Sequence, residues 1–393
     1  MRGFSLSRET KRLVIDQPFF LDSYAETGHV LPRLGLAYRS WGTLAPNGDN
    51  AIIVCHALTG SADADQWWAP FFGPGRVLDP EHDFIVCSNV LGGCYGSTGP
   101  ISKAPGGRPW GGHFPALTIR DQVRAQMALA DELGIRRIRL VLGGSMGGLQ
   151  ALEWALLDPE RVQAVASIAA SGRHSAWCAV WSEAQRLALA SDPKFRNGHY
   201  PPDDPPRTGL AAARAVAMGT YRSPQSLARR FGRASGAEVF GTQAHSPNEL
   251  AVHGWLRHHG KKLVDRFDAN SYRRLLDAMD THDLSRGRGD YESVLRGIRQ
   301  PVLVGSISSD GLYVPAEQHE LARLIPGARL VEIDSEHGHD GFLIDAEAFH
   351  PALLAFKHNN ASVAPRRSNA PVASHPQENS NPWLTPIVQQ YST

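Results

Sequence analysis

Residues 140–151 read Leu140-Val-Leu-Gly-Gly-Ser145-Met-Gly-Gly-Leu-Gln-Ala151, an apolar run followed by a Gly-x-Ser-x-Gly turn and a helical pattern. This order is typical of a nucleophile elbow, a sharp strand-to-helix turn that exposes a serine hydroxyl. Side chains at Gly143 and Gly147 would clash in so crowded a turn. The N–H groups and the positive end of the following helix favour an oxyanion near Ser145. A Gly-x-Ser-x-Gly alone is common by chance, so its interpretation depends on partners elsewhere in the chain.

The composition fits a soluble globular protein with one large domain and an insertion. The chain has 393 residues, of which 42% are hydrophobic and 20% are charged. The formal net charge is +1 and no basic run is present, so we expect no nucleic-acid partner. No apolar run approaches the ~18 residues of a membrane span. Residues 1–5 lack the apolar core of a signal peptide.

The four cysteines indicate a reducing compartment. Cys55, Cys87, Cys94 and Cys178 are scattered, and no Cys-x-x-Cys occurs. We expect buried free thiols, and therefore a cytoplasmic protein. The ligand spacings of a zinc site are missing, so we expect no metal.

Strand and helix patterns alternate along the first part of the chain. Continuous apolar runs predict buried strands at 51–55 and 84–87, and we predict further strands at 138–142 and 162–169. Helical patterns cover 118–133 and 146–157. Such alternation indicates an α/β fold, a mainly parallel sheet with helices on both faces.

The pattern changes near Ala170 and again near Arg299. Residues 170–299 show helical patterns and no convincing strand, which predicts a helical lid inserted over the carboxyl edge of the sheet. Residues 1–169 and 300–357 then form the core. After about His358 the chain is rich in Asn, Ser, Pro and Gln, so we expect residues 358–393 to be a disordered tail.

Two later loops supply candidate partners for Ser145. Asp310 follows an apolar strand pattern at 302–305, and His339 follows another at 329–333. A serine nucleophile needs a histidine base and a carboxylate that orients it. In α/β-hydrolases the three occur in the order Ser, Asp, His, each in a loop just beyond a strand. We therefore predict an α/β-hydrolase fold with this catalytic triad.

Each member of the triad has an alternative interpretation. Asp310 alone could cap a helix, since Pro315 and Glu317 follow it. His337 competes with His339 for the role of base. We prefer His339 because Gly338 frees the backbone beside it and an apolar helical pattern follows.

The oxyanion formed on a substrate carbonyl needs two N–H donors. The N–H of Met146, directly after Ser145, is the first. The loop after the 51–55 strand is the place for the second, and we predict the N–H of Leu58.

Four motifs resemble the homoserine O-acetyltransferases, and the likeness extends over about residues 15–357. They are His56-Ala-Leu-Thr-Gly60, Asn89-Val-Leu-Gly-Gly-Cys-Tyr-Gly-Ser-Thr-Gly-Pro100, Phe114-Pro-Ala-Leu-Thr-Ile-Arg-Asp121 and Gly143-Gly-Ser-Met-Gly-Gly148. The resemblance implies an α/β-hydrolase core with a helical lid, a homodimer and a place in methionine biosynthesis. Ser308-Ser-Asp-Gly-Leu-Tyr313 and Gly338-His-Asp-Gly-Phe-Leu343 also match, which supports Asp310 and His339.

The resemblance also implies how substrates are recognised. Arg214, in Gly209-Leu-Ala-Ala-Ala-Arg214, and Asp340 match positions that bind the amino-acid substrate in this family. A guanidinium suits a carboxylate, and a carboxylate suits an ammonium group. Members that use succinyl-CoA carry an arginine two residues after the triad aspartate. This chain has Leu312 there, which implies acetyl-CoA as co-substrate and no other cofactor.

The predicted function is a ping-pong transfer of acetyl from acetyl-CoA to L-homoserine through acetyl-Ser145. Segments of the lid resemble relatives that acetylate L-serine or an antibiotic precursor, so these acceptors stay open. The side chain of L-serine is one methylene shorter than that of L-homoserine, and an enzyme gains only about 1–3 kcal/mol of discrimination from one methylene. An esterase is a further alternative, because it shares the triad. The last alternative is a catalytically inactive binding protein with the same fold.

Overall fold

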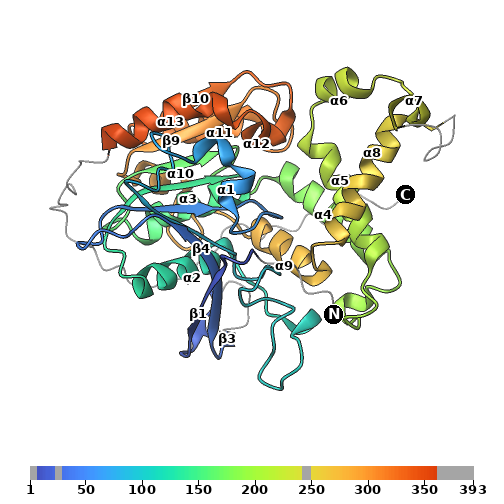
Figure 1. The fold of residues 1–393 in the computed structure, drawn as a ribbon, viewed down its shortest axis with the longest axis horizontal. Helices are drawn as coiled ribbons and strands as arrows, with labels where there is room; N and C mark the ends of the chain where they lie inside the picture. Colours follow the sequence, from blue (N-terminus) through green and yellow to red (C-terminus); the bar gives the residue numbers. More distant parts are fainter. Residues whose placement is uncertain (1–6, 23–28, 241–248, 361–393) are drawn as a thin grey trace, which may run out of the picture. The chain divides into compact units, whose positions relative to one another are not determined.

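A mainly parallel sheet lies at the centre of the fold (Figure 1). The computed structural model describes residues 7–22, 29–240 and 249–360. The sheet contains β1 (Lys11–Ile15), β4 (Leu34–Trp41), β5 (Ala51–Cys55), β6 (Phe84–Ser88), β7 (Ile138–Gly144), β8 (Val165–Ile168), β9 (Val302–Ile307) and β10 (Arg329–Ile333). Its eight strands lie in the order β1-β4-β6-β5-β7-β8-β9-β10. A separate antiparallel pair joins β2 (Phe19–Phe20) to β3 (Val30–Leu31).

The direction of pairing changes along the sheet. β1 pairs antiparallel with β4, and β4 pairs antiparallel with β6. Every pairing from β6 to β10 is parallel. The carboxyl ends of these parallel strands therefore meet at one edge of the sheet. The predicted α/β fold is confirmed.

Helices cover both faces of the sheet. The core helices are α1 (Ala64–Trp67), α2 (Ile119–Glu132), α3 (Met146–Leu157), α11 (Pro315–Leu324), α12 (Gly341–Ile344) and α13 (Ala346–Asn360). Successive side chains of a strand point to opposite faces. Ile53 accordingly belongs to the apolar cluster that contains Leu149 of α3, whereas Ile52 belongs to the one that contains Phe349 of α13. Burial on both faces explains why β5 is apolar throughout.

The segment between β8 and β9 is helical. It contains α4 (Ala176–Ala190), α5 (Arg207–Tyr221), α6 (Pro224–Phe231), α7 (Gly236–Phe240), α8 (Ala251–Val264), α9 (Ala269–Asp280) and α10 (Tyr291–Arg296). Trp177 Nε1 of α4 donates to the carbonyl of Gly311, beyond β9, at 2.8 Å. Arg266 Nη1, between α8 and α9, donates to the carbonyl of Thr59, beyond β5, at 2.8 Å. The lid thus contacts the loops at the carboxyl edge of the sheet.

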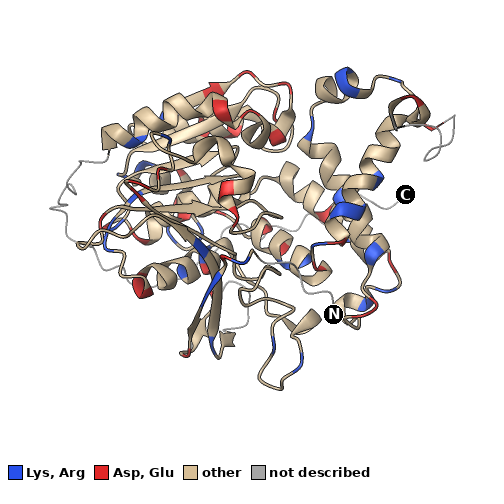
Figure 2. Cartoon of the chain, in the orientation of Figure 1, with Lys and Arg blue, Asp and Glu red and all other residues tan. Residues whose placement is uncertain are grey.

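Other sequence predictions concern the surface, the thiols and the tail. All four cysteines are buried free thiols, as predicted. None of the helices described here combines the length and apolar character that a membrane crossing needs. Figure 2 shows that acidic and basic residues are interspersed along the ribbon of both core and lid. The last helix, α13, runs beyond His358 to Asn360, and residues 361–393 of the predicted tail lie outside the described residues.

Candidate active site

Ser145 lies on a strained turn between β7 and α3. Its φ of 58° is in the left-handed region, which an L-residue adopts only at a cost. A Cβ on Gly143 would overlap the carbonyl of Gly147, and a Cβ on Gly147 would overlap the carbonyl of Cys55. The predicted reason for these glycines is confirmed, and the turn has the geometry of a nucleophile elbow.

The structure brings the three predicted triad side chains into one hydrogen-bonded chain. His339 Nε2 lies 2.8 Å from Ser145 Oγ, and His339 Nδ1 lies 2.8 Å from Asp310 Oδ2. All three residues are buried. They lie beyond the carboxyl ends of β7, β9 and β10, where a base can take the serine proton.

The second oxygen of Asp310 fixes the orientation of the carboxylate. Oδ1 accepts the N–H groups of Leu312 at 2.8 Å and Tyr313 at 3.0 Å, which leaves Oδ2 for His339. A carboxylate only accepts, so Nδ1 of His339 carries the ring proton and Nε2 can accept from the serine hydroxyl. The helix-cap interpretation of Asp310 is wrong, because the N-cap of α11 is Val314.

Two opposing effects set the pKa of His339. Burial alone lowers the pKa of the imidazole, but the charge and hydrogen bond of Asp310 outweigh it. The pKa of His339 is therefore raised above its ordinary value of 6.5.

The competing histidine lies elsewhere. His337 Nδ1 is 3.2 Å from Ser226 Oγ of α6, whereas His339 is the histidine bonded to Ser145. The preference for His339 agrees with this arrangement.

The two predicted oxyanion donors belong to neighbouring segments, the start of α3 and the loop after β5. Met146 is the first residue of α3, where an N–H has no partner within its own helix. Leu58 is buried in the loop after β5, and its N–H donates no hydrogen bond within the described residues. The close approach of Gly147 to Cys55 brings this loop against the first turn of α3.

Arg214 and Asp340 both lie near the catalytic histidine. Arg214, on α5, stacks its guanidinium 5.0 Å from the ring centroid of Tyr221, which lies 5.7 Å from the ring of His339. Arg214 Nη1 is buried and has no hydrogen-bond partner in the part of the chain that the structure describes. Asp340 directly follows His339, and burial raises the pKa of its carboxyl against the charge of Arg222.

Sequence reasoning missed two neighbours of this site. Arg222 Nε pairs with Asp340 Oδ2 at 3.1 Å, and Tyr221 packs beside His339. Both stand at the end of α5, seven and eight residues after Arg214, and no motif marks them. Only the contact between α5 and the turn at Gly338–Asp340 reveals their place.

Leu312 lies buried between the triad and the lid. Its N–H binds Asp310, and its carbonyl accepts the thiol of Cys178 on α4 at 3.3 Å. The residue predicted to select the acyl donor is therefore adjacent to the triad.

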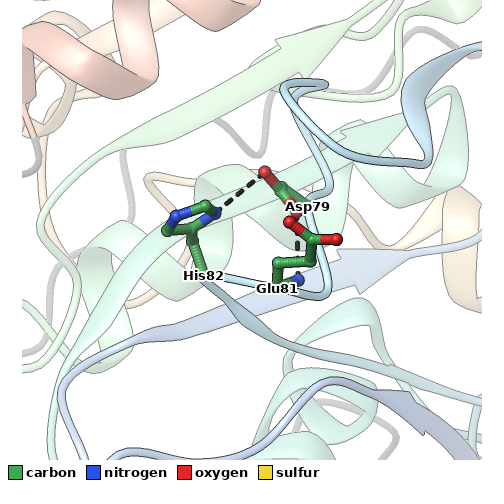
Figure 3. Close-up of side chains that lie close together, drawn as sticks. All are labelled: Asp79, Glu81 and His82. Atoms are coloured by element: carbon green, nitrogen blue, oxygen red, sulfur yellow. Dashed lines mark hydrogen bonds and ion pairs between the residues drawn. The ribbon is translucent and has the colours of Figure 1, made fainter.

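One group of side chains has the residue types and the spacing of a possible metal site. Asp79, Glu81 and His82 lie close together before β6 (Figure 3). The carboxylate of Asp79 accepts the N–H of Gly75 at 2.9 Å, the N–H of Glu81 at 3.0 Å and His82 Nδ1 at 3.0 Å. These bonds explain the cluster as a turn, so the absence of a metal stays a prediction.

Comparisons with known proteins identify the family. The model of the alpha/beta hydrolase fold matches residues 50–346. A curated homoserine O-acetyltransferase of Trichormus variabilis is 52% identical over 353 residues, which are 90% of this chain and 95% of the relative. The chain belongs to the homoserine O-acetyltransferase family. The resemblance predicted from the motifs is confirmed, and the chain is an acyltransferase.

Solved structures of homoserine O-acetyltransferases and esterases share this fold. A homoserine O-acetyltransferase from Bacillus anthracis superposes with a TM-score of 0.80 at 23% identity, covering 90% of this chain and 98% of that one. Esterase E22 superposes with a TM-score of 0.78 at 25% identity, covering 88% of this chain and 100% of that one. The fold alone therefore does not separate acyl transfer from ester hydrolysis.

Proposed function

We propose that this chain transfers an acetyl group from acetyl-CoA to the hydroxyl of L-homoserine, through an acetyl ester on Ser145. The observation that carries the proposal is the hydrogen-bonded chain from Ser145 through His339 to Asp310. The identity of 52% to a homoserine O-acetyltransferase supports this acceptor and a role in amino-acid biosynthesis.

Acylation forms the enzyme ester. His339 Nε2 takes the proton of Ser145 as Oγ attacks the thioester carbonyl. The N–H groups of Leu58 and Met146 stabilise the tetrahedral oxyanion. The C–S bond then breaks, and the sulfur of CoA takes the proton from His339.

Deacylation repeats these roles in reverse. His339 takes the proton of the homoserine hydroxyl, whose oxygen attacks acetyl-Ser145. The acetyl ester of homoserine leaves, and Ser145 regains its proton from His339. Water would hydrolyse the intermediate, so the lid over the carboxyl edge favours transfer by excluding it.

The charges around His339 suit an amino-acid acceptor. Arg214 Nη1 is buried with no hydrogen-bond partner among the described residues, so it has a site free for the substrate carboxylate. Asp340 offers a carboxylate to the ammonium group, and Arg222 holds it in place. Arg214 contacts Tyr221, which packs beside His339, and Asp340 directly follows His339, so an acceptor held by both charges has its hydroxyl near the base.

Leu312 supports acetyl-CoA as the donor. A succinyl group would bring a second carboxylate to the acyl site, and a leucine cannot pair with that charge. The proposed reaction uses acetyl-CoA as co-substrate and needs no other cofactor.

A screen of donors and acceptors tests the proposal. Free thiol is followed with acetyl-CoA or succinyl-CoA, together with L-homoserine, L-serine or another alcohol. We expect the highest kcat/KM for acetyl-CoA with L-homoserine, and no release by Ser145→Ala. A preference for L-serine would overturn the acceptor, and faster release from succinyl-CoA would overturn the donor. Free acetate formed regardless of acceptor would identify an esterase, and no acetyl transfer at all would identify a binding protein.

We also propose that the chain acts as a cytoplasmic homodimer. Trp177, Val180 and Leu187 follow helical spacing on α4 and are 48%, 59% and 62% exposed. Apolar side chains grouped on one exposed helix are typical of a surface that another protein covers. A second copy of this chain is the partner that the resemblance implies.

A further inference from the structure

Hydrogen bonds fix the peptide group between Ala57 and Leu58. Its carbonyl oxygen lies 2.8 Å from His56 Nδ1 and accepts the N–H of Gly60 at 2.9 Å. In a trans peptide the C=O and the N–H point to opposite sides. The bonds that hold the Ala57 carbonyl therefore also fix the direction of the Leu58 N–H.

The partners of His56 decide which ring nitrogen carries the proton. The N–H of Val90 lies 3.1 Å from His56 Nε2 and can only donate, so Nε2 is the acceptor. The carbonyl of Ala57 can only accept, so Nδ1 carries the proton. The ring is neutral, and burial lowers the pKa of His56 to about 4, which keeps it neutral near pH 7.

The loop is held from several directions. A Cβ on Gly60 would lie 3.0 Å from His56 Cβ, so the turn closes tightly over the ring. Gln150 Nε2 of α3 lies 3.5 Å from the carbonyl of His56, and Arg266 of the lid binds the carbonyl of Thr59. Carbonyl groups of the loop are thus occupied, while the N–H of Leu58 donates to no other described residue.

We propose that His56 is a positioning residue of the oxyanion hole: its Nδ1–H holds the Ala57 carbonyl and so directs the Leu58 N–H at the oxyanion formed on Ser145. The inference rests on the proposed function of Ser145 and Leu58. His56 touches no reacting atom. His56 keeps the Leu58 N–H in place before negative charge develops on the substrate oxygen. A donor that is already oriented stabilises this charge more strongly than one that must first reorient.

Two substitutions separate the two hydrogen bonds of the ring. His56→Asn places an amide nitrogen near the position of Nδ1, so it keeps the donor to Ala57 and loses the acceptor for Val90. His56→Gln places an amide oxygen near Nε2, so it keeps that acceptor and loses the donor. Both are made in the full chain and assayed for kcat, KM for acetyl-CoA, inhibition by CoA and Tm.

The proposal predicts a kcat effect that depends on the donor. His56→Gln lowers kcat by about 100-fold, the scale of losing one oxyanion donor, with KM and CoA inhibition unchanged. His56→Asn retains most of the wild-type kcat. Equal losses in the two variants, a loss confined to KM, or a wild-type kcat in His56→Gln overturns the proposal.

A measurement on the wild-type chain avoids any loss of folding. Nitrogen NMR of isotope-labelled histidine distinguishes the two neutral tautomers, and the structure requires the proton of His56 on Nδ1. A proton on Nε2 overturns the proposal. Failure of wild-type Ser145 to become acetylated would instead overturn the proposed function, so the two failures are distinguishable.

Discussion

At the scale of single residues, the two oxygens of Asp310 have separate partners. Oδ1 accepts two backbone N–H groups and Oδ2 accepts from His339. Asp310 thus anchors its own loop while it selects the tautomer of the base. This division makes the effect of an isosteric substitution predictable.

Asp310→Asn should preserve the fold and remove most activity. The amide oxygen would keep the bonds to Leu312 and Tyr313, so the amide nitrogen would face His339 Nδ1. Two donors cannot pair, so the ring proton would move to Nε2, which could no longer accept from Ser145. We expect kcat to fall by about 10⁴-fold, as for this change in serine proteases. Thiol release and circular dichroism check this, and near-normal kcat in the variant would contradict it.

The raised pKa of His339 predicts the pH dependence of acylation. As a base His339 acts in its neutral form, which predominates above its pKa. We expect kcat/KM for acetyl-CoA to fall with decreasing pH, with a midpoint above the ordinary histidine value of 6.5. Steady-state rates across pH, with folding monitored by fluorescence, measure it. A midpoint below that value would contradict the ion pair with Asp310.

The sequence predicts some site residues and not others for a physical reason. Ser145, Asp310 and His339 stand directly after strands whose apolar runs are recognisable, so their order and setting can be read from the chain. No recognisable sequence pattern precedes Arg222. Its pairing with Asp340 arises only because the end of α5 packs against the turn that carries His339.

At the scale of elements, the elbow depends on the close approach of β5 and α3. Gly147 meets the carbonyl of Cys55, so no side chain fits between the two elements. The same contact brings the Leu58 loop against the elbow. The packing of the turn therefore also places the loop of the proposed oxyanion donor Leu58.

Gly147→Ala should destabilise the protein. Its methyl group would overlap the Cys55 backbone, which cannot move without breaking the sheet. We expect the free energy of unfolding to fall by about 3 kcal/mol, measured by urea denaturation. Gly106→Ala is the matched control, because nothing lies within 4 Å of its added Cβ. Equal stability of the two variants would contradict the packing of the elbow.

Buried elements were easier to predict than edge elements. The ends of β5 and α3 agree with the sequence patterns because each element is apolar to its limits. Predicted strand 162–169 is shorter in the structure, since β8 covers only Val165–Ile168 and Ala169 turns away with φ of 49°. β1 has exposed Lys11 and Arg12, and only its pairing with β4 makes it a strand.

At the scale of the whole molecule, the helical lid between β8 and β9 is bonded to loops at the carboxyl edge of the sheet. Arg266 of the lid binds the carbonyl of Thr59, next to Leu58. Trp177 of the lid binds the carbonyl of Gly311, next to Asp310. These contacts join the insertion to both sides of the triad. In the reaction that we propose, this lid shields the acyl-enzyme from water until its acceptor binds.

Leu187→Glu should convert the proposed homodimer into monomers. A charge in the apolar face of α4 would be buried without a partner in the dimer. Sedimentation velocity measures the mass of both forms. Leu330→Glu, at a leucine 37% exposed on β10, is the control and should remain a dimer. A monomeric wild type, or a dimeric Leu187→Glu, would contradict the assignment of this surface.

The most direct test of the account is the mass of the full chain after incubation with acetyl-CoA alone. We predict one added acetyl group, mapped by peptide analysis to Ser145 and absent from Ser145→Ala. Addition of L-homoserine should remove it and yield the acetyl ester of homoserine. An unmodified Ser145, an acetyl group that persists with L-homoserine, or normal turnover by Ser145→Ala would contradict the account.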